Sequence, residues 1–165
     1  MYYSHKLLSQ NSQEILISNE DLLQSTARKL IVLVGIMFFG LWMFAGLSKI
    51  SEQFGYYISL LLLMGVFTAA AYIWVSYRIL AALIGWLTGL FLIVTTAVLF
   101  FPGSIFLYFY LPLPFIAVIL VNGWAGVGMQ VFILAALGGF SQIGLMPFLS
   151  ASNWVVVLSS SLLAF

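Results

Sequence analysis

The sequence contains no cysteine and very little charge. Without cysteine, disulfides and thiolate metal sites are excluded. Five basic and four acidic side chains make up 5% of the 165 residues, and residues 79 to 165 contain none of them. Soluble domains carry about 25% charged residues, so this chain cannot cover a globular surface with charge. We therefore predict an integral membrane protein.

Acid–base groups are also missing from the apolar segments. The only histidine, His5, lies in the polar N-terminal part, and the interiors of the predicted spans hold no Asp, Glu, His, Lys or Cys. General acid–base catalysis, metal binding and proton relays need such groups. The sequence has no phosphate-binding loop, and its net charge of +1 gives no nucleic-acid footprint. We therefore expect no enzymatic activity, no metal and no nucleic-acid partner for this chain.

What the chain has instead is hydrophobic sequence, which accounts for 64% of its residues. Short polar or Pro/Gly-containing turns divide it into six apolar runs, at residues 30–47, 56–75, 79–101, 105–121, 124–140 and 151–165. The last run has about fifteen residues where a span needs about 20, so we expect the chain to be one piece of a longer protein. The predicted fold is an all-α membrane protein with about six transmembrane helices, in which residues 30–165 form the bundle.

Residues 1–29 are polar and mixed in charge. Ser18 to Asp21 resemble a helix start, with acidic residues in the first turn. Leu22, Leu23, Ala27 and Leu30 then recur at helical spacing. We predict a cytoplasmic N-terminal segment with a short amphipathic helix at the membrane surface that leads into the first span. The alternative is a solvated tail before a retained signal anchor.

The basic residues predict the orientation. With the N-terminus inside, Lys6, Arg28, Lys29 and Arg78 all fall on the cytoplasmic side and only Lys49 falls outside. Short cytoplasmic loops of membrane proteins carry an excess of Lys and Arg. We therefore predict a multi-pass protein of the bacterial cytoplasmic membrane with a cytoplasmic N-terminus.

Two prolines interrupt the fourth apolar run. Pro112 and Pro114 each lack an N–H donor and crowd the carbonyl four residues earlier. We predict a kink or interruption near the middle of this span, with the hydroxyls of Tyr108 and Tyr110 close by. Freed backbone groups there need partners. Such a place could bind a lipid or a quinone, or the kink could simply fit the bundle.

A few uncharged polar and small residues complete the candidates. Asn122 and Gln130 could hold a pigment, as could Gln142 and Asn153, although such residues more often join helices by hydrogen bonds. Ala81, Gly85 and Gly89 form a small-residue stripe that lets two helices approach closely. The expected partners are the lipid bilayer and, through such a stripe, a second copy or other membrane subunits.

The order of these features resembles a known family. The segments YLPLPFIAVILVNGWAG and GLMPFLSASNW, with an Arg after the second span, are similar to the six-span N-terminal input modules of bacterial sensor histidine kinases of the Chloroflexi type. The resemblance covers most of residues 19–165. It implies a membrane sensor whose last span continues into a cytoplasmic coiled coil and a kinase or other output domain. No phospho-accepting His or ATP-binding motif of that kind stands in this sequence, so kinase activity is not assigned to it.

Three functions therefore remain open at the level of sequence. The first is the sensory input domain of a signalling protein, with no catalysis of its own. The second is an accessory structural subunit of a larger photosynthetic or respiratory membrane complex. The third is a small transporter or channel, for which the spans offer only uncharged polar side chains to line a path.

Overall fold

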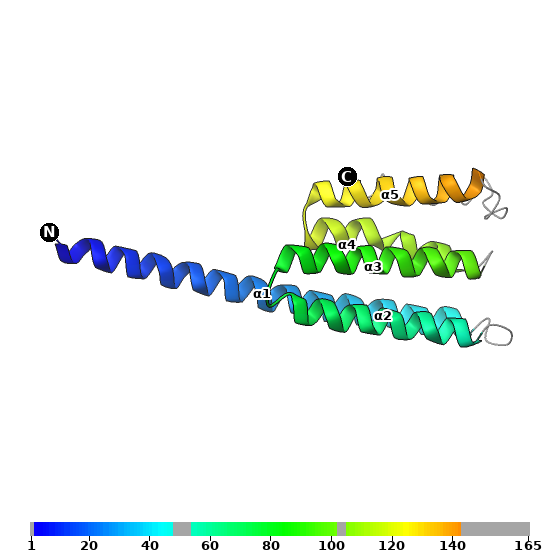
Figure 1. The fold of residues 1–165 in the computed structure, drawn as a ribbon, viewed down its shortest axis with the longest axis horizontal. Helices are drawn as coiled ribbons and strands as arrows, with labels where there is room; N and C mark the ends of the chain where they lie inside the picture. The colour runs from blue at the N-terminus through cyan, green and yellow to red at the C-terminus, as the bar shows by residue number, and fades with distance from the viewer. Residues whose placement is uncertain (1, 48–53, 102–104, 143–165) are drawn as a thin grey trace.

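The computed structural model describes residues 2–47, 54–101 and 105–142, with side chains from residue 21 onward. These residues form α1 (Tyr2–Leu47), α2 (Phe54–Trp74), α3 (Ile79–Phe100), the 3₁₀-helix η1 (Ile105–Tyr110), α4 (Pro112–Leu120) and α5 (Gly123–Gln142). The helices run alongside one another, and the N-terminal part of α1 projects beyond them (Figure 1). The all-α prediction is confirmed for the described residues.

Four of the described helices are long and apolar enough to cross a membrane. They are residues Asp21–Gly46 of α1 and the whole of α2, α3 and α5. The prediction of six spans is not supported. The expected fourth span, 105–121, is divided into η1 and α4, and the apolar helix Phe106–Leu120 is too short to be counted with the others. The expected sixth span lies outside the described residues.

The first helix differs most from its prediction. The sequence predicted a short surface helix and a span from residue 30, whereas α1 is one continuous helix of 46 residues. Its sequence has no Gly or Pro before Gly35, so nothing breaks the helix between the polar and apolar parts. At 1.5 Å per residue it is about 69 Å long, more than twice a hydrocarbon core of about 30 Å.

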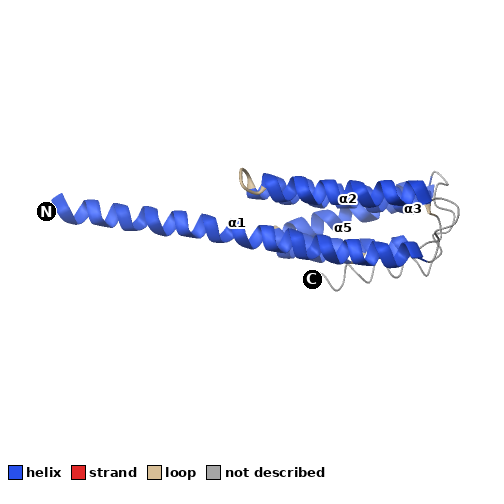
Figure 2. Cartoon of the chain, turned by 90° about the horizontal axis from the view of Figure 1, so that it is seen from below, coloured by secondary structure: helices blue, strands red, loops and turns tan. Residues whose placement is uncertain are grey.

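The helices pack mainly on their neighbours in sequence. Helix α1 packs on α2, α2 on α3, α3 on η1 and α4, and α4 on α5. Helix α3 is the most central of the four long helices. Within its apolar stretch of 18 residues 56% is buried inside the bundle, against 22% to 33% in the other three. The part of α1 before Asp21, which we call the arm, leaves the bundle at the end where α2 and α3 are joined (Figure 2).

Aromatic side chains fix η1 on α1. The fully buried Trp42 of α1 lies 4.7 Å from the ring of Phe106 and 5.5 Å from that of Phe109, centre to centre. Phe38, one turn before Trp42, meets Phe109 edge to face at 5.8 Å. In lipid, such close van der Waals packing rather than the hydrophobic effect holds helices together. The cluster places the 3₁₀ segment between α1 and α3.

Candidate functional site

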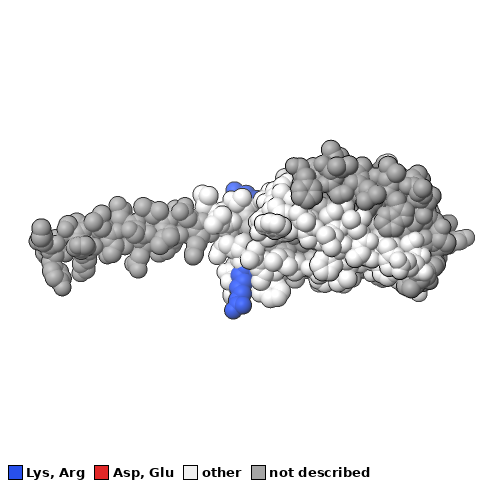
Figure 3. Space-filling view, turned by 90° about the horizontal axis from the view of Figure 1, so that it is seen from above, with Lys and Arg blue, Asp and Glu red and all other residues white. Residues whose placement is uncertain are grey.

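Basic side chains gather where the arm of α1 meets the bundle. The Arg28 guanidinium donates a hydrogen bond to the Ser76 hydroxyl in the turn between α2 and α3. The same guanidinium lies 5.4 Å from the centre of the Tyr72 ring, in cation–π geometry. Lys29 and Arg78 are exposed. The Lys and Arg atoms of the described residues stand out at this junction in Figure 3. The three residues predicted to set the topology thus lie at one end of the bundle.

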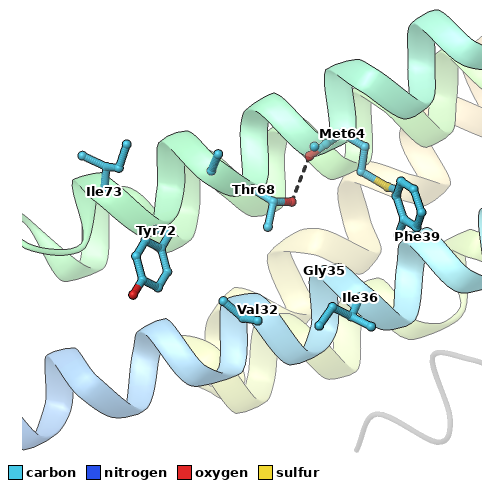
Figure 4. A pocket seen from close by; sticks show the side chains of 10 residues that line it. Val32, Gly35, Ile36, Phe39, Met64, Thr68, Tyr72 and Ile73 are labelled. Carbon is cyan, nitrogen blue, oxygen red and sulfur yellow. Dashed lines mark hydrogen bonds between the residues drawn. The ribbon is translucent and has the colours of Figure 1, made fainter.

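An open apolar groove of about 500 Å³ runs between α1 and α2 (Figure 4). Tyr72 and Thr68 project from α2 towards α1 along it. Three of its lining residues, Gly35, Gly65 and Ala69, have small side chains or none and leave the groove open. The lining residues are Val32, Gly35, Ile36, Phe39, Met64, Gly65, Thr68, Ala69, Tyr72 and Ile73.

Among the described residues, Thr68 has the only hydroxyl in the deeper part of this groove, and that hydroxyl is engaged within the protein. It donates a hydrogen bond to the Met64 carbonyl at 2.9 Å and accepts one from Trp86 Nε1 at 3.2 Å. A molecule in the deep part of the groove therefore meets mainly hydrocarbon.

A polar groove of about 730 Å³ continues from the apolar one towards the arm of α1. The two share Val32, Ile36 and Tyr72, so they form one channel along α1. Its polar part is lined by Asp21, Gln24, Ser25, Arg28 and Lys29. The Nε atom of Arg28 is buried and has no hydrogen-bond partner within the described structure. The α1–α2 channel, as we call the two grooves together, therefore has a basic mouth and an apolar floor.

The fourth apolar run is interrupted near its middle, as predicted, and the prolines lie at the start of the helix that follows the break. Leu111 is the N-cap of α4, and Pro112 and Pro114 occupy its first turn. The N–H groups of a first turn have no partner inside the helix, so proline removes nothing there. The preceding residues wind as a 3₁₀ helix, in which the Leu111 N–H donates to the Tyr108 carbonyl at 3.1 Å.

The two tyrosines near the prolines are not brought together. The Tyr110 side chain is buried, and its hydroxyl donates to Thr95 Oγ1 at 2.7 Å. Thr95 in turn donates to the Phe91 carbonyl at 2.8 Å. Tyr108, in contrast, is 50% exposed. Neither tyrosine lines the α1–α2 channel.

The polar candidates of α5 have separate surroundings. Asn122 is exposed and caps α5, because its Oδ1 accepts a hydrogen bond from the Ala125 N–H at 2.8 Å. Gln130 lies two turns further along the helix and is buried. Gln142 is the last residue of α5 rather than part of a loop, and Asn153 lies outside the described residues.

The three residues of the small-residue stripe of α3 have different surroundings. Gly89 is buried, and a Cβ atom there would stand 2.4 Å from the ring of Phe67 on α2. A Cβ at Gly85 would meet nothing within 4 Å, and Ala81 is exposed. Only the C-terminal member of the stripe is thus a place where α2 and α3 approach closely.

Comparison with known proteins found no relative of this chain. No family model, no curated protein and no solved structure matches this chain. Within the described residues, no group of three or more His, Cys, Asp or Glu could hold a metal ion. The resemblance to sensor kinase input modules therefore stays a proposal.

The α1–α2 channel was missed at the level of sequence. Its polar part was read as a surface helix and its apolar part as an ordinary span. The available signal was Arg28 and Lys29 followed by the small residue Gly35 on one helix, and Gly65 and Ala69 on the next. That signal cannot be used until the packing of α1 on α2 is known.

Proposed function

We propose that this chain is a non-catalytic membrane module that serves as the input part of a signalling protein. The observation that carries the proposal is the continuity of α1. One helix runs from the arm outside the bundle to the aromatic cluster around Trp42 inside it. A shift of that packing would move the arm as a rigid body, and a moving arm can act on an output domain that lies beside it, although that domain is expected to follow the last span.

The junction of arm and bundle supports a relay as well. Arg28 joins α1 to α2 through Tyr72 and to the turn between α2 and α3 through Ser76. Because these contacts lie at the point where the arm leaves, they couple the position of the arm to α2 and to the turn that leads into α3.

We also propose that this end of the bundle faces the bacterial cytoplasm. Arg28, Lys29 and Arg78 lie there, as an excess of basic residues on the cytoplasmic side predicts. Tyr77 is 78% exposed in the turn after α2, and Trp124 is 84% exposed in the first turn of α5. Exposed Tyr and Trp prefer the level of the headgroups.

A chimera tests the signalling role. Residues 1–165 replace the input domain of a histidine kinase, and autophosphorylation is measured in membranes. Ser12→Pro breaks the arm of α1 and is expected to change kinase activity at least threefold, whereas Ser12→Ala leaves it unchanged. Equal activity of both variants, at equal membrane levels, would exclude α1 as the relay.

An accessory subunit of a larger membrane complex is the second candidate. Its support is the large apolar surface, since only 22% of the apolar windows of α2 and α5 is buried within the bundle. Such a subunit would co-purify in mild detergent with a complex of several other proteins. Recovery of the chain alone or as a small oligomer would argue against it.

A further inference from the structure

The α1–α2 channel has the dimensions of one membrane leaflet. Its apolar part on α2 extends from Met64 to Ile73, which is roughly 14 Å of helix at 1.5 Å per residue. Half of a hydrocarbon core is about 15 Å. The polar part follows directly. With the basic end of the bundle at the headgroup level, as proposed above, the channel reaches to about the middle of the bilayer.

Its chemistry changes along the same direction. The deep part offers hydrocarbon, because the Thr68 hydroxyl is already engaged with Met64 and Trp86. The mouth offers the Arg28 guanidinium, which also contacts Ser76 and Tyr72, and the ammonium of Lys29.

The mouth also contains one carboxylate. Asp21 lies seven residues before Arg28, about 10 Å further out along the helix. An anion between Arg28 and Lys29 is thus separated from it by about two helical turns. The net charge at the inner part of the mouth, around Arg28 and Lys29, is therefore positive.

We propose that the α1–α2 channel is a binding site for an anionic glycerophospholipid of the surrounding bilayer. One acyl chain lies in the apolar groove, and the phosphate lies between Arg28 and Lys29. The charge complementarity and the match to one leaflet identify a lipid rather than a second protein chain. The site does not depend on the signalling role, and either can fail without the other.

Retention of lipid by the purified chain tests the site. The chain is reconstituted with equal amounts of phosphatidylglycerol and phosphatidylcholine, extracted in mild detergent, and its bound lipids are counted by native mass spectrometry. A basic residue that contacts the lipid phosphate favours retention of anionic lipid about fivefold. The wild-type chain should therefore retain phosphatidylglycerol over phosphatidylcholine, and Arg28→Gln or Lys29→Gln should each lower that ratio about fivefold. Arg78→Gln, which lies outside the channel, should change it less than twofold.

A second pair of variants tests the apolar part without touching the charges. Gly65 lines the groove, and a Cβ there meets nothing within 4 Å, so Gly65→Leu starts from an open position and extends a side chain into the groove. It should lower the retention of both lipids at least threefold. Gly40→Leu is the matched control, since Gly40 is exposed, has equal space and does not line the channel.

Three results would overturn the proposal. The first is equal retention of the two lipids by the wild-type chain. The second is unchanged retention in Gly65→Leu with the elution volume and helical content of the wild type. The third is a wild-type dimer that Gly65→Leu converts to a monomer, because a second copy would then occupy the groove.

Discussion

Gly85 and Gly89 lie one helical turn apart on α3 but have different surroundings. The sequence could identify the stripe that contains them, because small residues at this spacing lie on one face. It could not tell which of them touches another helix, since that depends on where Phe67 of α2 points. Spacing predicts a face of a helix, and only the packed structure shows which residues of that face are in contact.

A matched pair of substitutions follows at this scale. Gly89→Ala places a methyl group 2.4 Å from the Phe67 ring, so the ring or the helix must move. Overpacking of this kind costs about 1–3 kcal/mol. Gly85→Ala adds the same group in open space and is expected to leave stability unchanged or slightly raised. Thermal unfolding in detergent measures both, and equal midpoints would contradict the close approach of α2 and α3.

At the scale of elements, sequence predicted some helices well and others poorly. Predicted spans 56–75, 79–101 and 124–140 agree closely with α2, α3 and α5, because a turn or cap signal such as Ser76 to Arg78 or Asn122 marks their ends. The predicted first span was shorter than α1, because the polar residues before residue 30 were taken as its boundary. No Gly or Pro separates these residues from the apolar part of the helix. The break in segment 105–121 was predicted from its prolines, but the 3₁₀ winding before the break was not, because such winding has no clear signature in sequence.

The position of the prolines gives a prediction for α4. Pro112 is in the first turn, so Pro112→Ala removes a favourable start but no clash. We expect α4 to keep its boundaries and the free energy of unfolding to fall by less than about 1 kcal/mol. Ile116→Pro, in the interior of α4, should cost about 3 kcal/mol or more. A marked rise in helical content or stability in Pro112→Ala would show instead that the proline interrupts a longer helix.

For the whole molecule, the turn between α2 and α3 and the turn between α4 and α5 lie at the same end as the arm of α1. Helix α2 returns from the far end to the turn at Ser76, and η1 with α4 returns to Asn122, where α5 begins (Figure 1). The segment 105–120 measures roughly 27 Å, because six residues rise 2.0 Å each and the other ten 1.5 Å each. It is thus slightly shorter than a hydrocarbon core of about 30 Å.

Sidedness of labelling is the most direct measurement of the central claim, that α1 and α2 cross the membrane with the basic end inside. The chain lacks cysteine, so single cysteines at Gln10, Ser51 and Tyr77 can each be tested with a membrane-impermeant maleimide on intact spheroplasts. The account predicts labelling of Ser51→Cys only, with Gln10→Cys and Tyr77→Cys labelled after the membrane is opened. Labelling of Tyr77→Cys and Gln10→Cys from outside, or of all three from one side, would contradict it.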